Sequence, residues 1–200
     1  MPYTSPFPAL QLSVTEKAEL CHTVSELVSE VERTYESLQQ QHATHWTLVR
    51  ERDDVRVYHD RRQGAGTGNR NMHLLVATGT TPGTLPDVMY GMLNHSTDAM
   101  RVKTAYVGDT LVDGAVLESI LEPTDERPFQ SMTIKWFVKG VPLHVRVVSK
   151  QRDAVILDAC GTKRLANGDI IGYRLLHSVS LAQTPPLPAY DRFRLSFTTI

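Results

Sequence analysis

Residues 131–140 read SMTIKWFVKG, and this stretch decides how the rest of the chain is interpreted. Apolar side chains occupy every second position, at Met132, Ile134, Trp136 and Val138. Successive side chains of a β-strand point to opposite faces, so a period of two predicts a strand with one buried face. Trp136 is one of two tryptophans and the bulkiest anchor on that face. We therefore interpret the chain as a sheet assembled around this strand.

The composition narrows the class of protein. The chain has 200 residues, 41 % of them hydrophobic, and a net charge of −1, whereas nucleic-acid-binding proteins usually carry a clear basic excess. Cys21 and Cys160 are too few and too far apart for a disulfide framework, which favours a reducing compartment. No apolar run approaches the roughly 18 residues of a membrane span. We expect a soluble, cytoplasmic protein whose association with a membrane, if any, is peripheral, and no nucleic-acid partner.

An irregular lead-in at 1–12 precedes a long helix. Ser13 and Glu16 fit the capping-box pattern, in which each side chain accepts a hydrogen bond from the backbone N–H of the other residue. Apolar residues then recur every three or four positions, which predicts an amphipathic helix ending near Gln41. Pro82 marks the start of a second helix, and 94–99 is predicted to form a short helical turn.

The rest of the chain is dominated by strand patterns. The predicted strands are 46–50, 55–60, 72–80, 105–111, 115–122, 129–138, 154–163, 170–181 and a start at 193–200. The connections between them are short, and the Asn-Gly pair at 167–168 is the clearest hairpin signal. Short connections favour antiparallel pairing of successive strands. We therefore predict a single α+β domain over 13–200.

No motif in the sequence predicts catalysis or a bound metal. The glycine-rich segment 64–68 lacks the Lys-Ser/Thr pair of a phosphate-binding loop and leads into a predicted strand. His42 and His45 have no third ligand at a usable spacing and are better explained as exposed residues at a helix end. Neither Ser131 nor Cys160 has the sequence context of a nucleophile. We therefore expect no catalytic residue, no metal and no cofactor, although carboxylates paired in space are invisible in a sequence.

Charged residues on otherwise apolar strands are more informative. Asp158 and Lys135 interrupt two such strands, and Arg174 and His177 lie in a third. The simpler interpretation is that these residues line the solvent face of a one-sided sheet. The alternative is that one or two of them orient a ligand in a mostly apolar cavity.

Three segments, together with the order of elements, are similar to a known family. They are IKWFVKGVP at 134–142, SKQRDAV at 149–155 and GYRLLHSV at 172–179. On these segments, the chain resembles the START (steroidogenic acute regulatory protein-related lipid transfer) domain over 13–200. It is most similar to divergent START-like domains of protists, some of which are joined to a FYVE zinc finger. The resemblance implies a helix-grip fold, in which a curved antiparallel sheet wraps a C-terminal helix around a tunnel for one lipid-like molecule.

The resemblance also implies which residues line the tunnel. We predict ligand contacts from Met132, Ile134, Lys135, Trp136, Val138, Ile156, Asp158, Tyr173 and Leu175. In cholesterol-binding members an acidic residue and an arginine face each other in the cavity, and Asp158 falls at the arginine's position. Depending on where the gap is placed, its partner falls near Thr133, Lys135 or Lys139. A pair of reversed polarity, Lys135 with Asp158, is therefore a hypothesis, and sterol specificity does not transfer. Lys135 and Trp136 lie on opposite faces of their strand, and the alternation favours Trp136 as the inward residue.

The resemblance predicts non-enzymatic binding or transfer of a lipid or another hydrophobic molecule. Two alternatives stay open: a helix-grip enzyme acting on an apolar substrate, and an adaptor or membrane-targeting domain with a collapsed cavity. The family's C-terminal lid helix has no counterpart before Ile200, where the chain stops within a strand pattern. We expect a domain truncated at its C-terminus, which continues in the natural protein or associates as it stands. A transient membrane contact and further domains beyond Ile200 are compatible with this interpretation.

Overall fold

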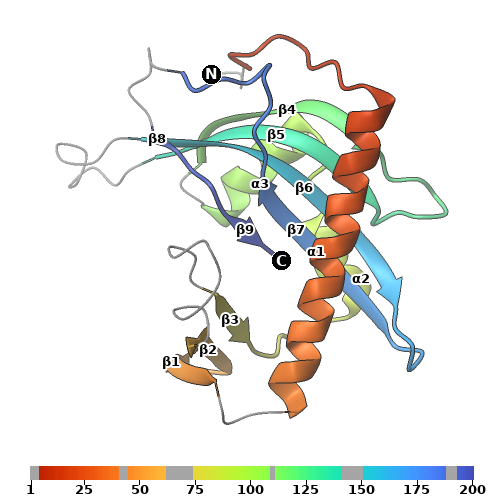
Figure 1. Ribbon diagram of the computed structural model, residues 1–200, viewed down its shortest axis with the longest axis vertical. Coiled ribbons are helices and arrows are strands. Elements are labelled where there is room, and N and C mark those ends of the chain that lie inside the picture. The colour runs from red at the N-terminus through yellow and green to blue at the C-terminus, as the bar shows by residue number, and fades with distance from the viewer. Residues whose placement is uncertain (1–4, 41–44, 62–73, 109–110, 141–150, 188–192) are drawn as a thin grey trace. The chain divides into compact units, whose positions relative to one another are not determined.

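The structure is a computed structural model that describes residues 5–40, 45–61, 74–108, 111–140, 151–187 and 193–200 (Figure 1). The contacts divide the chain into two compact units. The larger unit comprises residues 1–28 and 85–200, and the smaller comprises residues 29–84. The single domain expected over 13–200 stays a prediction.

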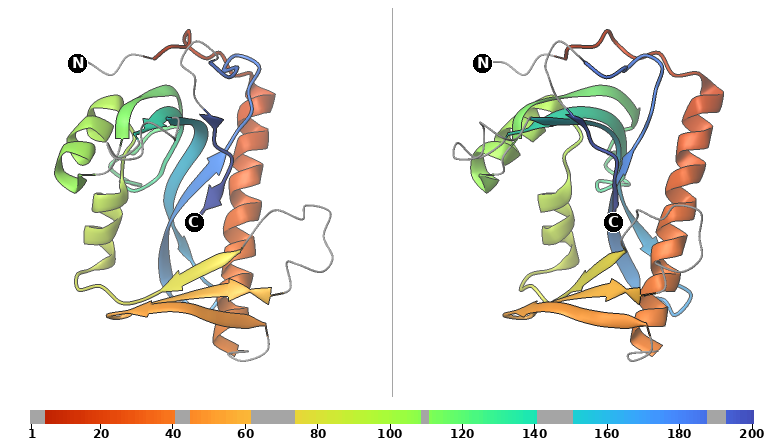
Figure 2. Two further views of the ribbon diagram at one scale, coloured as in Figure 1. Left: turned by 90° about the vertical axis from the view of Figure 1, so that its left-hand side faces the viewer. Right: turned by 60° about the vertical axis from the view of Figure 1, so that its left-hand side comes forward.

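The larger unit is built on a curved sheet (Figure 2). Its strands are β4 (Leu111–Leu121), β5 (Ser131–Lys139), β6 (Arg152–Arg164), β7 (Ile170–Ser178), β8 (Phe193–Arg194) and β9 (Thr198–Thr199). They follow the order β4-β5-β6-β7-β9, and β8 lies beside β6. All neighbours are antiparallel except β8, which pairs in parallel with the start of β6. The strands predicted at 115–122, 129–138, 154–163 and 170–181 are confirmed with shifted ends, and 193–200 contains β8 and β9.

Strand β5 is buried on both faces. Every residue from Ser131 to Val138 is buried, including the polar Thr133 and the charged Lys135. The expectation of one buried and one solvent-exposed face is therefore wrong. The physical reason is that helices of the larger unit cover both faces of the sheet (Figure 2). Residues 14–28 of α1 (Val14–Gln40) lie on one side, and α2 (Leu85–Met92) and α3 (Thr97–Val107) lie on the other.

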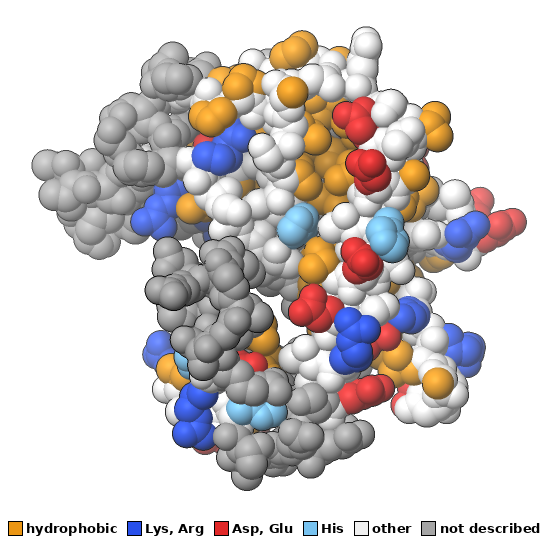
Figure 3. Space-filling view, viewed as in Figure 1, with side chains coloured by type: hydrophobic (Ala, Val, Ile, Leu, Met, Phe, Trp, Pro, Cys, Tyr) orange, Lys and Arg blue, Asp and Glu red, His pale blue; other side chains and the backbone are white. Residues whose placement is uncertain are grey.

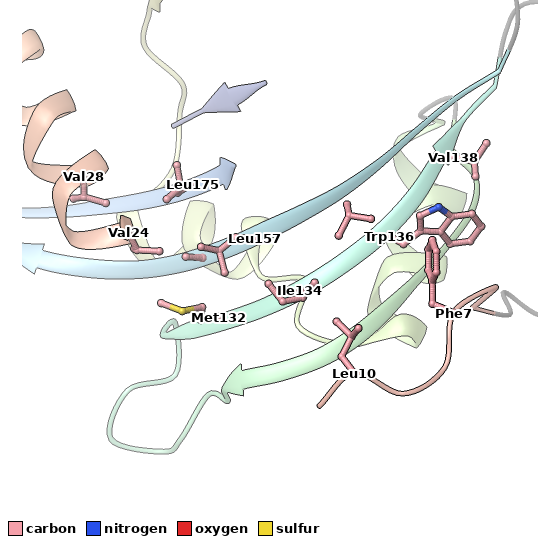
Figure 4. Packing of buried hydrophobic residues seen from close by; sticks show 12 residues of the cluster. Phe7, Leu10, Val24, Val28, Met132, Ile134, Trp136, Val138, Leu157 and Leu175 are labelled. Carbon is pink, nitrogen blue, oxygen red and sulfur yellow. The ribbon is translucent and has the colours of Figure 1, made fainter. Parts of the chain in front are cut away.

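The face toward α1 carries the main hydrophobic core (Figure 4). Val24 and Val28 of α1 pack there against apolar residues of β5, β6 and β7. The lead-in has no helix or strand from residue 5 to residue 13, yet Phe7 and Leu10 are buried in this core. The ring of Phe7 meets that of Trp136 edge to face, with centroids 6.1 Å apart. The lead-in is therefore part of the fold, because it supplies apolar surface that the sheet needs to be covered.

Helix α1 begins with the predicted capping box. The backbone N–H of Ser13 donates to Glu16 Oε2 at 2.8 Å, and the backbone N–H of Glu16 donates to Ser13 Oγ at 3.2 Å. These two bonds satisfy donors that the first helical turn leaves without partners. The helix ends at Gln40, one residue before the predicted end.

Helix α3 replaces an expected strand. The strand predicted at 105–111 is wrong, because one helix runs through Thr97–Val107. The helical turn predicted at 94–99 is confirmed from Thr97 onward, but it is the start of a longer helix. Ser96 caps its start by accepting a hydrogen bond from Ala99 N, and Gly108 ends it in the left-handed conformation at φ 62°. The capping residues decide this segment, whereas the β-branched and aromatic residues at its end suggested a strand.

Strand β4 is an edge strand with an irregular register. Its pairing with β5 is shifted between Leu111 and Asp113, between Val116 and Glu118, and again before Leu121. On its outer side, the backbone N–H of Val116 donates to Thr97 Oγ1 at 3.0 Å. Helix α3 therefore occupies a donor that a neighbouring strand would otherwise use.

The smaller unit contains a three-stranded antiparallel sheet in the order β1-β2-β3. Its strands are β1 (Trp46–Arg52), β2 (Val55–Asp60) and β3 (Leu75–Thr78), which confirm the predictions at 46–50, 55–60 and, for its described part, 72–80. Asp53 takes up a positive φ of 52° in the turn between β1 and β2. The glycine-rich segment 64–68 and His42 lie outside the described residues.

Candidate functional site

Three charged side chains meet on the sheet face that points away from α1. They are Lys135 on β5, Asp158 on β6 and Arg174 on β7, so three neighbouring strands each supply one. Lys135 Nζ donates to Asp158 Oδ2 at 2.6 Å. Arg174 donates twice to the same carboxylate, from Nη2 to Oδ2 at 2.7 Å and from Nε to Oδ1 at 3.1 Å. Lys135 Nζ also donates to the backbone carbonyl of Asn94, between α2 and α3.

The cluster lies almost entirely inside the protein. Lys135 and Asp158 are 3 % and 4 % exposed, whereas the Arg174 side chain is 21 % exposed. Burial by itself would raise the pKa of Asp158, but the hydrogen bonds from Arg174 and the charge of Lys135 outweigh it and lower the pKa. Burial lowers the pKa of Lys135; Asp158 opposes this effect, and Arg174 and Lys103 add to it. Arg174 is therefore the member of the cluster that solvent reaches.

The surroundings of the cluster are mostly apolar. The buried and partly buried residues of this face are Met100, Leu111, Val116, Phe137, Ala154, Ile156, Leu176, Leu195 and Phe197. Two polar atoms on the link between α2 and α3, Asn94 Oδ1 and His95 Nδ1, are buried without a hydrogen-bond partner. Burial also raises the pKa of the Cys160 thiol, which is paired in register with Arg174. The arrangement can orient a polar group, but it does not provide an activated thiolate.

A second buried carboxylate, Asp153, lies on the opposite face of β6. Its Oδ2 accepts a hydrogen bond from Trp136 Nε1 at 3.1 Å. Arg194 donates to both of its oxygens, from Nε at 3.1 Å and from Nη2 at 3.0 Å. Arg194 Nη1 also donates to the carbonyl of Thr184, and Nη2 to that of Pro185. Asp153 therefore pairs with one cation, Arg194, and each of the three guanidinium nitrogens of that arginine donates a hydrogen bond.

The chain is similar to several solved structures, among them two human proteins. Human StAR-related lipid transfer protein 5 has 18 % sequence identity and a TM-score of 0.50, over 87 % of this chain and 70 % of that chain. Human STARD10 has 16 % identity and a TM-score of 0.48, over 80 % of this chain and 54 % of that chain. The chain thus spans about half the length of STARD10. No protein-family model and no curated protein matches the sequence.

The chain has a START-like fold. Its long N-terminal helix and curved antiparallel sheet are those of the helix-grip α+β class, as the sequence predicts. At these identities the likeness concerns the fold alone. The similarity to protist domains joined to a FYVE finger stays a prediction. After β7, the described residues contain β8 and β9 and no helix.

The residues predicted to contact a ligand divide between the two faces of the START-like sheet. Six of them belong to the core toward α1: Met132, Ile134, Trp136, Val138, Tyr173 and Leu175. The other three, Lys135, Ile156 and Asp158, lie on the opposite face. The two sets therefore cannot line one cavity, and the ligand-binding role of each stays a prediction. The hypothesised contact between Lys135 and Asp158 is present at 2.6 Å.

Sequence reasoning missed the part that Arg174 takes in this cluster. The charge was visible on an apolar strand, but its partner depends on the register between β6 and β7, where Cys160 pairs with Arg174 and Asp158 with Leu176. The solvent-facing position expected for Asp158 and Lys135 is wrong, because both are buried. Their mutual neutralisation makes that burial tolerable.

A hollow of about 490 Å³ lies on the connection between β4 and β5. It is lined by Leu121, Glu122, Thr124, Asp125, Glu126, Arg127 and Gln130, and contains none of the predicted ligand-binding residues. Within the described ranges, no group of three or more His, Cys, Asp or Glu side chains could hold a metal ion. Within the same ranges, no helix is long and apolar enough to cross a membrane.

Proposed function

We propose that the chain binds a lipid or another hydrophobic molecule without transforming it, on the face of the sheet that carries Lys135. The buried cluster of Lys135, Asp158 and Arg174 carries this proposal. Ionised groups are costly to bury, and a few polar groups among apolar side chains are what orients a ligand in a binding site. The similar human protein is named as a lipid transfer protein, and the shared fold supports extending that role to this chain.

The choice of face follows from how the two faces are filled. Toward α1, Trp136 is 1 % exposed and is held by Phe7 and Asp153, so that face is a packed core. Toward α2 and α3, Arg174 is reached by solvent and two buried polar atoms have no partner. A ligand head group at Arg174 would accept from a guanidinium nitrogen that donates to no described residue, whereas no such group is needed at Trp136.

Binding rather than catalysis is favoured by the chemistry of the same face. The thiol beside the cluster, Cys160, is buried and its pKa is raised, so it is a poor nucleophile at neutral pH. Lys135 and Arg174 both donate to Asp158 and favour its ionised form. The carboxylate therefore has no proton to donate as a general acid, and its lowered pKa makes it a weak general base.

Photo-crosslinking to a fatty acid that carries a diazirine on its chain tests both the binding and the face. The purified chain is first extracted with organic solvent, refolded and checked by circular dichroism, then irradiated with the probe and digested. We expect the labelled peptides to come from 85–107, the segment of α2 and α3. On the face shown in Figure 3, apolar side chains gather beside the N-terminal half of α1, and label confined to residues 5–28 would place the ligand there instead.

Native mass spectrometry tests the binding independently of its position. We expect a one-to-one complex with an added single-chain amphiphile, and a higher midpoint of thermal unfolding in its presence, because a ligand that binds the folded state stabilises it. An adaptor with a collapsed cavity would show neither effect with any amphiphile, and that outcome would sink the proposal.

A further inference from the structure

We infer that the head group of the bound molecule carries a negative charge, and that Arg174, supported by Lys135, is its receptor. This inference rests on the proposed function and specifies the class of ligand.

The cluster has more cations than anions. Asp158 forms ion pairs with two cations, Lys135 at 2.6 Å and Arg174 at 2.7 Å. With all three groups ionised, the cluster carries one positive charge in excess. Lys103 on α3, whose Nζ donates to the carbonyl of Gly91, acts on Lys135 with a further positive charge. Buried charges of one sign are costly unless a partner compensates them, so an anion next to this cluster is stabilised.

Arg174 uses only part of its hydrogen-bonding capacity. Its Nε and Nη2 donate to Asp158, whereas its Nη1 makes no hydrogen bond to any residue that the structure describes. A guanidinium carries five N–H donors in a planar fork that matches the oxygens of a carboxylate or phosphate. The side chain as a whole is 21 % exposed, so Arg174 is the member of the cluster that a ligand can approach from solvent.

The link between α2 and α3 carries two buried polar atoms without a hydrogen-bond partner among the described residues. Asn94 already contacts Lys135 through its backbone carbonyl, and its side-chain Oδ1 is buried without a partner. The adjacent His95 Nδ1 is also buried without a partner. An amide can turn its NH₂ group and an imidazole can carry its proton on Nδ1, so both side chains can donate to an anionic oxygen. A neutral alcohol would use fewer of these donors.

A carboxylate and a phosphate ester share this chemistry, and matched ligands separate them. Decanoate, decyl phosphate and decanol have the same alkyl chain and differ in the head group, and inorganic phosphate supplies the anion without the chain. Binding to the delipidated chain is measured by isothermal titration calorimetry below the micellar concentration. We expect decanoate or decyl phosphate to bind at least about 10-fold more tightly than decanol, the effect of one charge-assisted hydrogen bond.

Two substitutions locate the effect. Arg174→Gln removes the charge and keeps a polar side chain, and we expect it to reduce the preference for decanoate over decanol by about 10-fold. Arg174→Lys keeps the charge but loses the fork, so it should retain part of the preference. Arg152→Gln makes the same charge change at an exposed position on β6 and serves as the matched control, with the preference unchanged.

The outcomes distinguish this inference from the proposed function. Equal affinity for decanol and decanoate overturns the anionic head group and leaves lipid binding in place. Binding of none of the three amphiphiles overturns both proposals. If inorganic phosphate binds as tightly as decyl phosphate, the alkyl chain contributes nothing to the affinity. That result would overturn the proposal of an amphiphilic ligand and leave only an anion site at the cluster. If circular dichroism shows that Arg174→Gln does not fold, the inference is still tested by two measurements. They are the affinities of the wild type for decanoate and decanol, and the same preference in Arg174→Lys.

Discussion

Two buried aspartates on strand β6 are neutralised in different ways. Asp153 and Asp158 are 2 % and 4 % exposed, and they point to opposite faces of the sheet. Asp153 is matched by a single cation, Arg194, whereas Asp158 is shared by Lys135 and Arg174. One strand therefore presents a neutral pair toward α1 and a cluster with excess positive charge toward α2 and α3.

The two arginines show what the difference means. Their side chains are equally exposed, at 22 % for Arg194 and 21 % for Arg174, so accessibility alone does not distinguish them. Arg194 also donates to two backbone carbonyls, from Nη1 to Thr184 and from Nη2 to Pro185. In contrast, Nη1 of Arg174 has no acceptor among the described residues. An arginine whose three nitrogens all donate stabilises the fold, and one with a nitrogen that donates to no described residue is able to take a ligand.

The largest expected effect comes from removing the shared carboxylate. Asp158→Asn leaves two cations without a counter-charge, one of them almost fully buried, and should lower the free energy of unfolding by about 3–5 kcal/mol. Asp153→Asn leaves one cation that keeps two carbonyl acceptors, and should cost about 1–3 kcal/mol. Urea unfolding of both variants measures this, with the exposed Asp125→Asn as the control. A larger loss for Asp153→Asn than for Asp158→Asn would contradict the comparison.

The arginines should show the reverse order. Arg194→Gln leaves Asp153 buried with only the indole N–H of Trp136 as a donor, and should cost about 3 kcal/mol. Arg174→Gln leaves Asp158 paired with Lys135, and should cost about 1 kcal/mol. The two variants carry the same substitution at equally exposed side chains, so each is the control for the other. Equal losses in urea unfolding would mean that the two sites are energetically alike.

Removing the second cation should have a small effect. Lys135→Met leaves Asp158 with Arg174 in a one-to-one pair like that of Asp153 and Arg194, and replaces a buried charge by an apolar chain of similar length. Such replacements are often neutral, so the free energy of unfolding should change by less than about 1 kcal/mol. A loss of several kcal/mol, measured by the same unfolding experiment, would show that Lys135 is needed to hold Asp158.

Acid should destabilise the fold in part through Asp158. The pKa of Asp158 is lowered in the folded protein, so its stabilising contribution is complete above its unfolded pKa of about 3.9 and is lost as the pH falls through the folded pKa. The unfolding midpoint of the wild type should therefore fall below about pH 4, and less steeply in Asp158→Asn. Urea titrations at a series of pH values measure both slopes, and parallel slopes would count against this assignment.

The fold was largely predictable because its signals are local. Alternation over 131–140 predicts β5, the Ser13–Glu16 pair predicts the start of α1, and the Asn-Gly pair at 167–168 predicts the hairpin between β6 and β7. The error at 105–111 is also local, since the cap at Ser96 and the glycine at 108 outweigh the strand-forming residues between them. In this segment the chain follows the helix caps rather than the strand propensity of single residues.

The candidate site was predictable only in part because it depends on register. The contact between Lys135 and Asp158 came from the family resemblance, and the structure contains it. Arg174 joins them because β7 pairs with β6 at one particular offset, and no property of either strand alone fixes that offset. Burial of the charged face was missed for a similar reason, since alternation in β5 does not reveal that α2 and α3 cover its polar side.

The irregular register of β4 has a consequence for the protein at high concentration. A regular edge strand is a template on which the edge of a second molecule can pair, and this is how many β-proteins form fibres. The longest uninterrupted run of pairing in β4 is the four residues from Asp113 to Val116, and the N–H of Val116 already donates to Thr97. An incoming strand would meet a twisted ladder with a blocked donor at its centre. We therefore expect this edge to resist growth into an extended intermolecular sheet.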